Sequence, residues 1–422
     1  MKKYKLGEIC TIVPGYAFKA TDFGKGLNYV IKIKDIMPPY IDILHSEKVE
    51  TVIDKKYEIK YGDFVMAMTG ATIGKIGKLQ IDSESKVYIN QRVCKFIPEA
   101  FCDKEYLYYK LNTQEFQQFI YNNVDSKLAQ PNIGHPTIYK YELELPLLSE
   151  QRRIGQFLKA IDDKIALNRS INHNLEAIAK QLYDYWFVQF DFPDENGKPY
   201  KSSGGKMVWN EKLKREIPEG WHCGNLFEIA VFTNGLACQK FRPKPGEKPL
   251  PVIKIREMHD GISSDAEEVS SNIPESVKVY NGDVLFSWSA SLEVMLWACG
   301  LGGLNQHIFK VTSANDFPKS FYYFQLLNYV DVFKKMAEAR KTTMGHITQD
   351  HLQQSTIAIP DNKDVADKFE KRISPLFAQM IKLQEEIQQL TKQRDELLPL
   401  LMNGQVKVGV ERSRLNYDLS ND

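Results

Sequence analysis

Three short segments carry residue types that act on nucleic acids or nucleotides in other proteins. Met37-Pro38-Pro39-Tyr40 is close to the Asp/Asn-Pro-Pro-Tyr loop of adenine-N6 methyltransferases, but methionine cannot accept a hydrogen bond from the target amino group. Segment 70–76 is close to a phosphate-binding loop, yet it is one residue short, and Ile76 replaces the Ser or Thr that would hold Mg²⁺. Glu84-Ser85-Lys86 has the E-x-K pattern of many nucleases, and the other half of the chain has no counterpart. None of the three predicts an active site.

Histidine and cysteine also give no catalytic or metal-binding pattern. The eight histidines form neither an HExxH motif nor a Ser/His/Asp signature, and the six cysteines form no CxxC pair. We therefore expect free thiols, no metal, no cofactor and no catalytic residue in this chain.

Composition predicts a protein of two or more folded domains. The chain has 422 residues, of which 43% are hydrophobic and 26% are charged, so it is neither disordered nor membrane-spanning in composition. No apolar run approaches the roughly 20 residues that span a bilayer, and no signal peptide is seen, so we expect a cytoplasmic protein. The net charge of +1 neither predicts nor excludes nucleic acid, so a DNA-binding surface must come from local clusters.

The sequence is internally duplicated. Five segments recur in the same order with an offset between about 211 and 222 residues, and any one match alone would be weak. The pairs are Leu6-Gly7-Glu8-Ile9 with Leu226-Phe227-Glu228-Ile229, Ile31-Lys32-Ile33-Lys34 with Ile253-Lys254-Ile255-Arg256, Tyr61-Gly62-Asp63-Phe64-Val65 with Asn281-Gly282-Asp283-Val284-Leu285, Asn90-Gln91-Arg92 with Asn305-Gln306-His307, and Gly134-His135 with Gly345-His346.

Each half ends in a long helix with a coiled-coil seam. A spacing of alternately four and three residues keeps one stripe of a helix facing a partner, and the second stripe follows the first by 215 residues without a gap. The first seam is Ile154, Leu158, Ile161, Ile165, Asn168, Asn172, Leu175, Ala179, Leu182 and Trp186. The second seam is Phe369, Ile373, Leu376, Met380, Leu383, Ile387, Leu390, Arg394, Leu397 and Leu401. We expect the two helices to pack on each other.

Two features of these helices have alternative interpretations. Asn168, Asn172 and Arg394 are either buried, where they cost stability and fix the register, or solvated where the helices diverge. Pro375 lacks a backbone donor, so the second helix either starts near it or kinks there.

The resulting layout is an α+β chain of two duplicated mixed domains and two long helices. Short β-branched and aromatic runs predict strands over 29–33, 64–68, 93–97, 252–255, 284–288 and 308–311, and helical patterns cover Lys104–Tyr121 and Lys319–Ala339. We expect a first domain over 1–148, a central long helix over 149–190, an exposed linker over 191–215, a second domain over 216–361, a distal long helix over 362–402 and a flexible tail over 403–422.

Basic, amide and hydroxyl residues in both halves are candidates for DNA binding because their donors match phosphates and base edges. Asn90 and Gln91 recur unchanged as Asn305 and Gln306, which indicates a shared structural role. Arg92 and His307 differ, which is expected where two domains read different sequences. The candidates are Lys19, Thr69, Thr72, Lys75, Arg92, Lys127 and Gln130 in the first half, and Lys240, Arg242, Ser287, Ser289, His307, Arg340, Lys341 and Thr342 in the second.

Taken together, the order of these features resembles the specificity subunit of type I restriction–modification systems over about residues 1–405. The resemblance rests on the duplicated layout and on four segments: the Gly62-Asp63 strand followed by Thr69–Lys75, the helix start Leu148–Ile154, the aromatic segment Tyr185–Pro193, and Asn196–Gly205. The second helix start departs from the first, because Pro360–Asp364 lacks the Gln151-Arg152-Arg153 triplet, so the two starts need not contact partners identically.

The resemblance implies two target-recognition domains that each read one half of a bipartite DNA site, joined by two antiparallel coiled-coil helices. Two modification subunits would bring S-adenosylmethionine and adenine-N6 methylation, and two restriction subunits would bring ATP, Mg²⁺ and cleavage. This chain would itself be non-catalytic. A helix from residue 154 to 186 would span roughly 48 Å, or about 14 base pairs at roughly 3.4 Å each.

Two other function classes remain as alternatives. An orphan methyltransferase or nuclease would need the cofactor loop and the catalytic residues that the sequence lacks. A coiled-coil protein scaffold without sequence-specific DNA binding would tolerate loss of Arg92 or Arg340 with no change in DNA affinity.

Overall fold

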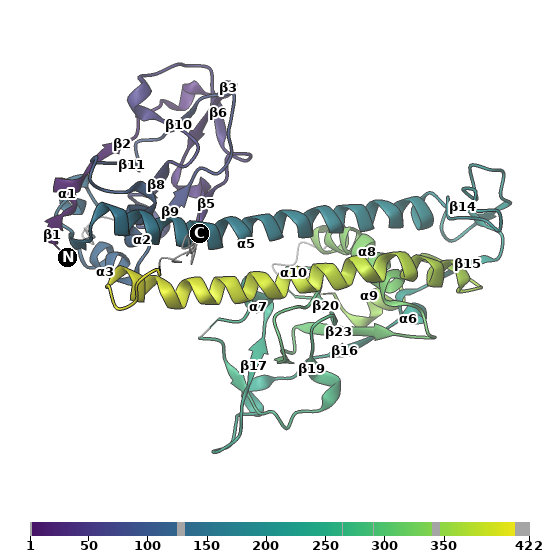
Figure 1. Ribbon diagram of the computed structural model, residues 1–422. Helices are drawn as coiled ribbons and strands as arrows, with labels where there is room; N and C mark the ends of the chain where they lie inside the picture. The colour runs from purple at the N-terminus through teal and green to yellow at the C-terminus, as the bar shows by residue number, and fades with distance from the viewer. Residues whose placement is uncertain (1, 125–130, 264, 290, 340–346, 410–422) are drawn as a thin grey trace, which may run out of the picture. The chain divides into compact units, whose positions relative to one another are not determined.

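The computed structural model describes residues 2–124, 131–263, 265–289, 291–339 and 347–409 (Figure 1). The chain packs into two compact units. Unit 1 comprises Met1–Asp163 with Thr391–Asp422, and unit 2 comprises Lys164–Leu390. Each long helix therefore contributes one part of its length to each unit.

Unit 1 contains a domain of two sheets and short helices, here called domain 1 (residues 2–145). Its sheets have the strand orders β2-β11-β8-β9-β5-β4 and β6-β3-β10-β7, and β1 pairs with β12. The elements are β1 (Lys2–Lys5), α1 (Leu6–Ile9), β2 (Cys10–Pro14), η1 (Ala20–Asp22), β3 (Phe23–Ile31), η2 (Ile33–Asp35), β4 (Ile36–Met37), β5 (Tyr40–Ile41), β6 (Glu47–Val49), η3 (Lys55–Tyr57), β7 (Glu58–Ile59), β8 (Phe64–Ala67), η4 (Gly70–Thr72), β9 (Ile76–Lys78), β10 (Val87–Ile89), β11 (Val93–Pro98), α2 (Lys104–Leu111), α3 (Gln114–Asn122), α4 (His135–Ile138) and β12 (Glu142–Leu145).

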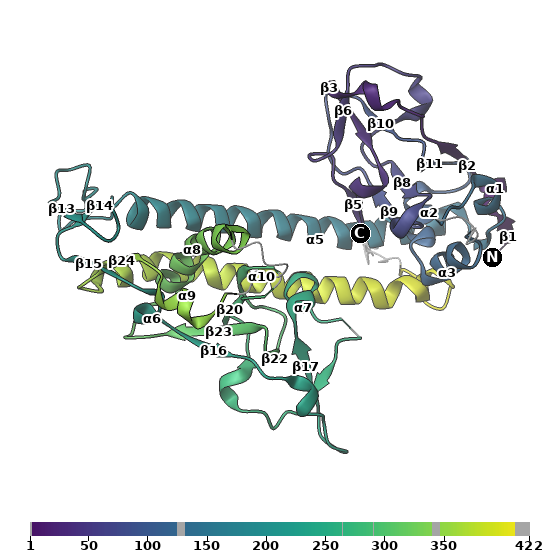
Figure 2. The same ribbon diagram turned by 180° about the vertical axis from the view of Figure 1, so that it is seen from behind.

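Unit 2 contains the second domain, here called domain 2 (residues 221–360), preceded by the hairpin β13–β14 (Figure 2). Its sheets have the orders β16-β23-β20-β21 and β18-β17-β22-β19, and β15 pairs with β24. The elements are β13 (Met207–Asn210), β14 (Arg215–Pro218), β15 (Trp221–Gly224), α6 (Leu226–Ile229), β16 (Ala230–Asn234), η6 (Cys238–Lys240), β17 (Leu250–Ile253), α7 (Ile255–Asp260), β18 (Glu268–Val269), η7 (Glu275–Val277), β19 (Lys278–Val279), β20 (Val284–Ser287), β21 (Glu293–Leu296), β22 (Gly302–Leu304), β23 (Ile308–Ser313), α8 (Lys319–Ala339), α9 (Gln349–Gln353) and β24 (Ile357–Pro360).

The two domains have the same topology, which confirms the duplication and the α+β fold class. β2-β11-β8-β9 corresponds to β16-β23-β20-β21, and β6-β3-β10-β7 corresponds to β18-β17-β22-β19. The parallel pair β3–β10 recurs as β17–β22, whereas the neighbouring pairs are antiparallel in both sheets. Domain 1 differs by carrying β5 and β4 at the edge of its larger sheet.

The predicted strands are confirmed to within a few residues, and both predicted helical segments are helical, but one of them is interrupted. Segment 104–121 forms two helices, α2 and α3, instead of one. The break has a local cause, because the Asn112 side chain donates to the Tyr108 carbonyl and the Thr113 hydroxyl donates to the Lys110 carbonyl. Such side-chain bonds to nearby carbonyls compete with a continued helix. In α8 the corresponding residues are Leu327 and Asn328, and that helix continues to Ala339.

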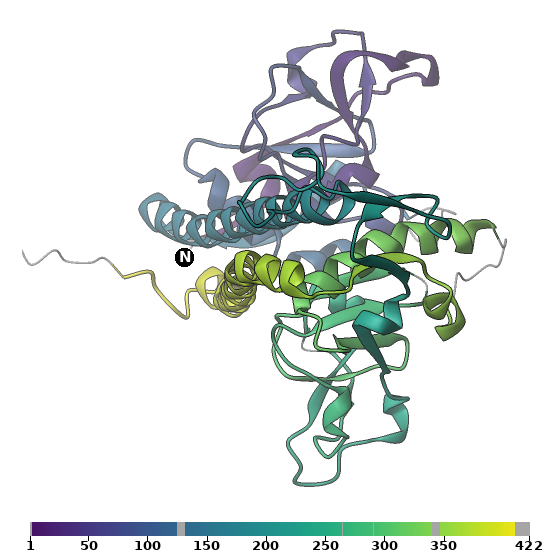
Figure 3. The ribbon, with the colours of Figure 1, turned by 90° about the vertical axis from the view of Figure 1, so that its right-hand side faces the viewer.

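The long helices are α5 (Leu148–Tyr183), followed by a π-type turn η5 (Asp184–Val188), and α10 (Asp364–Met402). Helix α10 begins eleven residues before Pro375, so the alternative in which it starts near that proline is wrong. Every residue of both predicted seams is buried or half-buried. In unit 2 the Asn168 side chain donates to Glu386 and the Asn172 side chain to the Met380 carbonyl. The later residue of α5 bonds the earlier residue of α10, so the helices run antiparallel there. Figure 3 views the two helices nearly along their axes.

The buried polar interpretation holds for the first of these asparagines. Asn168 has no exposed surface. Its amide reaches Glu386 over 2.8 Å, and Lys164 lies 3.5 Å from the same carboxylate. The solvated alternative is therefore wrong at this position.

The predicted exposed linker is wrong in its first residues. Phe192 is buried in the core of unit 2, where its ring stacks on Trp221 with 5.6 Å between ring centroids. The Asp191 carboxylate accepts hydrogen bonds from the backbone and the hydroxyl of Ser202. The predicted tail also starts differently, because the backbone of Gln405 and Val406 bonds back to the Leu400 carbonyl, and Val408 packs against the core of unit 1.

No helix in the described ranges is long and apolar enough to cross a membrane.

Candidate nucleic-acid interface

One backbone turn recurs in both domains, and we call it the NQ turn: Asn90–Val93 in domain 1 and Asn305–Ile308 in domain 2. Each connects the central strand of one sheet to a strand of the other, β10 to β11 and β22 to β23. The amide of Val93 donates to the Asn90 carbonyl over 2.8 Å, and Ile308 donates to the Asn305 carbonyl over 3.1 Å. The duplication therefore extends to individual hydrogen bonds.

A glycine directly after β2 or β16 locks each turn. The Gly15 amide donates to the Val93 carbonyl, and the Gly235 amide donates to the Ile308 carbonyl. A Cβ atom at either glycine would lie 2.2 Å from the carbonyl oxygen of the first turn residue, Asn90 or Asn305. Only glycine permits this close approach of two backbones.

The second residue of each turn also has the same backbone partner. The backbone N–H of Gln91 donates to the Tyr16 carbonyl, and the backbone N–H of Gln306 donates to the Leu236 carbonyl. The shared structural role that the identical Asn-Gln pairs predict is thus seen in the backbone of both turns.

The third residue of the turn differs, and its side chain is exposed in both domains. In domain 1 the Arg92 carbonyl accepts from Met68, the residue after β8, while the Lys75 carbonyl accepts from Ala67, the last residue of β8. Arg92 and Lys75 therefore lie on opposite sides of one strand end, with backbones about 10 Å apart, which is two strand spacings. Both side chains are exposed, so they form a pair of cations at the end of β8.

Domain 2 has an aromatic cluster at the same place. The Trp288 amide donates to the His307 carbonyl, as Met68 does to Arg92. The Trp288 ring lies 5.6 Å from the exposed His307 ring, and its indole N–H donates to the Asn234 side chain over 3.3 Å. Asn234 and Trp288 were missed in the sequence because each aligns with a dissimilar residue, Pro14 and Met68. The duplicated glycine beside Asn234 was the only available signal.

The connection between the two strands is also shorter in domain 2. Residues 288–292 join β20 to β21, whereas residues 68–75 join β8 to β9, so the loop position of Lys75 has no counterpart. The fully buried Ser287 hydroxyl donates to the Ser291 carbonyl and accepts from the Glu293 amide over 3.1 Å. That hydroxyl holds the short loop together.

The remaining predicted residues fall into three groups. Lys19, Lys240 and Arg242 are exposed and come shortly after the locking glycines that follow β2 and β16. Thr69 and Ser289 are buried, Thr72 is half-buried, and Thr69 forms a backbone bridge with Asn132. Five candidates lie outside the described residues, and they stay predictions: Lys127, Gln130, Arg340, Lys341 and Thr342.

The chemistry available at these turns is recognition by hydrogen bonds and charge. Arginine, lysine, histidine and glutamine offer donors to phosphates and base edges. Across the described part of the chain, no group of three or more His, Cys, Asp or Glu side chains could hold a metal ion. Burial raises the pKa of the Cys94 thiol to about 12, so it remains protonated at neutral pH and is a poor nucleophile.

Comparison with known proteins finds similarity to specificity subunits of type I restriction enzymes. The family model for the type I restriction modification DNA specificity domain matches residues 1–177. The chain is 25% identical over 328 residues to the type I restriction enzyme MjaIX specificity subunit of Methanocaldococcus jannaschii, covering 76% of this chain and 73% of that protein. It is 23% identical over 470 residues to the type I restriction enzyme HindI specificity subunit of Haemophilus influenzae, covering 96% and 99%.

A solved structure shares the fold. The crystal structure of the type I restriction–modification system S subunit from M. genitalium aligns with a TM-score of 0.57 over 95% of each chain, at 14% sequence identity. At this identity the likeness concerns the fold alone.

Proposed function

The chain belongs to the family of specificity subunits of type I restriction–modification systems, and we propose that its two domains each read one block of a bipartite DNA sequence through their NQ turns. The observation that carries this proposal is one backbone frame, built twice, with an exposed third residue that differs between the copies. A conserved frame keeps the docking geometry constant, while Arg92 or His307 sets the base that is read.

In domain 1 the proposed division of labour follows the chemistry of the two cations. Arginine makes bidentate hydrogen bonds to the O6 and N7 atoms of guanine, the most frequent specific contact in the major groove. Lys75 and Lys19 offer point charges that suit phosphates and set the orientation of the domain. In domain 2 the His307 ring and the Gln306 amide offer both donors and acceptors, with Lys240 and Arg242 as phosphate contacts.

The chain is a non-catalytic subunit and works with other subunits of a type I complex. We propose that two modification subunits dock on the long helices and bring S-adenosylmethionine, and that two restriction subunits bring ATP and Mg²⁺. This chain itself then needs no cofactor.

The two helix starts support unequal docking of those partners. Gln151 in α5 is buried, and its side chain accepts from the Asp103 amide and donates to the Pro146 carbonyl, so it fastens α5 to domain 1. Arg152 and Arg153 are exposed and free to meet a partner. The residues 215 positions later are Ala366, Asp367 and Lys368, so α10 does not repeat this basic pair.

The test is genome-wide mapping of N6-methyladenine in cells that express this chain with its modification subunit. We expect new methylation at a split motif of two short, different blocks around a fixed gap. A stable complex without new methylation would favour the alternative of a protein scaffold without sequence-specific DNA binding.

A further inference from the structure

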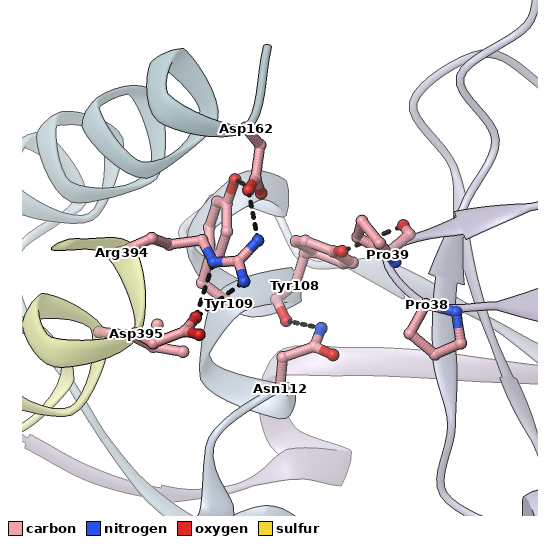
Figure 4. A pocket seen from close by; sticks show the side chains of 9 residues that line it. Pro38, Pro39, Tyr108, Tyr109, Asn112, Asp162, Arg394 and Asp395 are labelled. Atoms are coloured by element: carbon pink, nitrogen blue, oxygen red, sulfur yellow. Dashed lines mark hydrogen bonds and ion pairs between the residues drawn. The ribbon is translucent and has the colours of Figure 1, made fainter. Parts of the chain in front are cut away.

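A buried polar network fastens the end of α10 in unit 1. The Arg394 guanidinium lies 2.9 Å from the Asp162 carboxylate of α5, and the Tyr109 hydroxyl of α2 donates to the other oxygen of Asp162 over 2.6 Å (Figure 4). Only 12% of the Asp162 side chain and 21% of the Arg394 side chain are exposed. We call Tyr109, Asp162 and Arg394 the polar trio.

The contacts within the polar trio keep Arg394 charged and Tyr109 protonated. Burial alone would lower the pKa of Arg394, but the hydrogen bond and charge of Asp162 outweigh it and hold that pKa above its usual value. Burial, together with the Asp162 charge, raises the pKa of Tyr109, so its hydroxyl remains a donor. Asp395 adds a second, more exposed carboxylate 2.8 Å from Arg394.

Unit 2 has an apolar set at the equivalent positions. The offset of 215 residues that relates the two helices also relates α2 to α8, so Tyr109, Asp162 and Arg394 correspond to Phe324, Phe377 and Ala179. These three residues, which we call the apolar trio, are buried in one hydrophobic core, where the Phe324 and Phe377 rings lie 5.8 Å apart. The position of Ala179 has no exposed surface. Adding 215 to 162 and subtracting 215 from 394 leaves their sum unchanged, so a single antiparallel register places both pairs of positions opposite each other.

The near-symmetry of the helices creates a pairing problem. Because the seams repeat without a gap, α5 of one copy offers α5 of a second copy the same apolar stripe that α10 offers, except at Asn168, Asn172 and Ala179, where α10 has Leu383, Ile387 and Arg394. Helix α10 likewise offers this stripe to a second α10. In an α5–α5 pair, however, Asp162 and Tyr109 would face Ala179 instead of Arg394. In an α10–α10 pair, Arg394 would face Phe377 and Phe324. Each wrong pair therefore buries a charge without its partner, which is strongly unfavourable.

We infer that the polar and apolar trios form a pairing code that makes α5 choose α10 of its own chain over the equivalent helix of a second copy. The favourable contacts within each trio do not by themselves distinguish the chain's own helix from that of a second copy, since both trios are well packed. Discrimination comes from their difference, as in coiled coils whose pairing is fixed by one buried polar layer. This role is separate from DNA reading and does not depend on the proposed function.

The test compares full-length chains that carry different combinations of the two trios. An all-apolar chain carries Tyr109→Phe, Asp162→Phe and Arg394→Ala, and an all-polar chain carries Phe324→Tyr, Phe377→Asp and Ala179→Arg. A swapped chain carries all six changes and so exchanges the trios between the units. Each chain is made with two different affinity tags, the tagged forms are unfolded and refolded together, and the mixed species are quantified by sequential purification.

We expect the all-apolar and all-polar chains each to form at least tenfold more mixed species than the wild type, since either uniform chain accepts a second copy. The swapped chain should return to the wild-type level, because its two ends again differ. The pairing code would be overturned if the all-apolar and all-polar chains both mixed only as much as the wild type. It would also be overturned if the swapped chain mixed as much as those two chains.

A second measurement keeps the inference testable if the uniform chains refold poorly. Arg394→Ala alone leaves Asp162 buried without its main partner, whereas the all-apolar chain removes that charge as well. The pairing code requires Arg394→Ala to unfold at a lower urea concentration than the all-apolar chain. A single variant that is as stable as the all-apolar chain would show that the trios are not complementary sets, and the inference would fail.

Discussion

In domain 1 the exposed residue of the NQ turn is Arg92, with Lys75 across the end of β8; in domain 2 it is His307, beside the Trp288 ring. The backbone beneath them is the same, down to the locking glycine and the carbonyl that each turn amide contacts. The comparison shows which positions the fold must keep and which it leaves free. Amides and glycines are fixed by geometry, whereas side chains that face solvent can diverge after duplication without cost to the fold.

The largest effect is expected from replacing the glycine that locks the NQ turn in each domain. Gly15→Ala and Gly235→Ala each place a Cβ atom 2.2 Å from a carbonyl oxygen, so one backbone segment must move. We expect each to destabilise its own domain by about 1–3 kcal/mol, as for other overpacked sites. Hydrogen exchange of β10–β11 or β22–β23 measures the loss in each domain.

Gly134→Ala is the matched control for this prediction. Its Cβ would meet only an ordinary van der Waals contact at 3.4 Å, with Pro136. If the control is as damaging as Gly15→Ala, or if a glycine variant loosens the other domain equally, the locked turn is not the cause.

A smaller effect is expected from the residue that distinguishes domain 2. Trp288→Met copies the domain 1 residue and removes the packing against His307 and the hydrogen bond to Asn234. Loss of an aromatic contact of about 1 kcal/mol should weaken binding to the domain 2 half-site about fivefold. Competition binding with DNA changed in one half-site at a time measures this. Equal weakening at both half-sites would contradict separate reading, and Met68→Trp serves as the reciprocal variant.

The cation pair of domain 1 should appear in the salt dependence of binding. Lys75→Ala removes one proposed phosphate contact, which should reduce the slope of log affinity against log salt by about 1 without changing the preferred sequence. Lys159→Ala on α5, where Lys159 pairs with Asp163, is a control with the same change of charge. An unchanged slope in Lys75→Ala, or the same reduction in the control, would remove Lys75 from the interface.

The smallest effect concerns a pH-sensitive histidine in domain 2. His222 on β15 lies 2.5 Å from Asp361 and 3.2 Å from Glu228. Burial lowers its pKa, but the hydrogen bonds to Asp361 and Glu228 outweigh this and raise the pKa above 6.5. A raised pKa in the folded state means that the stabilisation is complete below pH 6.5 and is lost as the pH rises through the folded value.

We therefore expect hydrogen exchange in β15 and β24, corrected for its intrinsic pH dependence, to increase modestly above neutral pH. His222→Gln should abolish that dependence. The equivalent pair β1 and β12 in domain 1 carries Lys2 at the start of its first strand and should show no such change. A pH dependence that survives in His222→Gln would assign it to another group.

Sequence alone predicted the repeated elements well because duplication and periodicity are local signals. The strands around Phe64, Val93, Val284 and Ile308 follow from short β-branched and aromatic runs between turns, and both long helices follow from their seams. The split between α2 and α3 was missed because it depends on two side-chain bonds from Asn112 and Thr113 to nearby carbonyls. The linker was misjudged because Phe192 lies among turn-forming residues, whose composition hides its burial.

The candidate interface was predicted only in part. Arg92 and His307 followed from the aligned Asn-Gln pairs, but the role of Trp288 depends on a cross-strand neighbour that no spacing in the sequence reveals. Ser287 was proposed for DNA contact from residue type, and its hydroxyl instead bonds within its own loop. The polar trio was likewise hidden, since Tyr109, Asp162 and Arg394 come from three distant segments.

The most direct test of the central claim is to map N6-methyladenine for three chains, each co-expressed with the modification subunit: the wild type, Arg92→Ala and His307→Ala. We expect the wild type to methylate one asymmetric bipartite motif. Arg92→Ala should relax one block, His307→Ala should relax the other, and the gap should stay unchanged in both. Relaxation of both blocks by either variant, or of neither block by both, would contradict separate reading by two NQ turns.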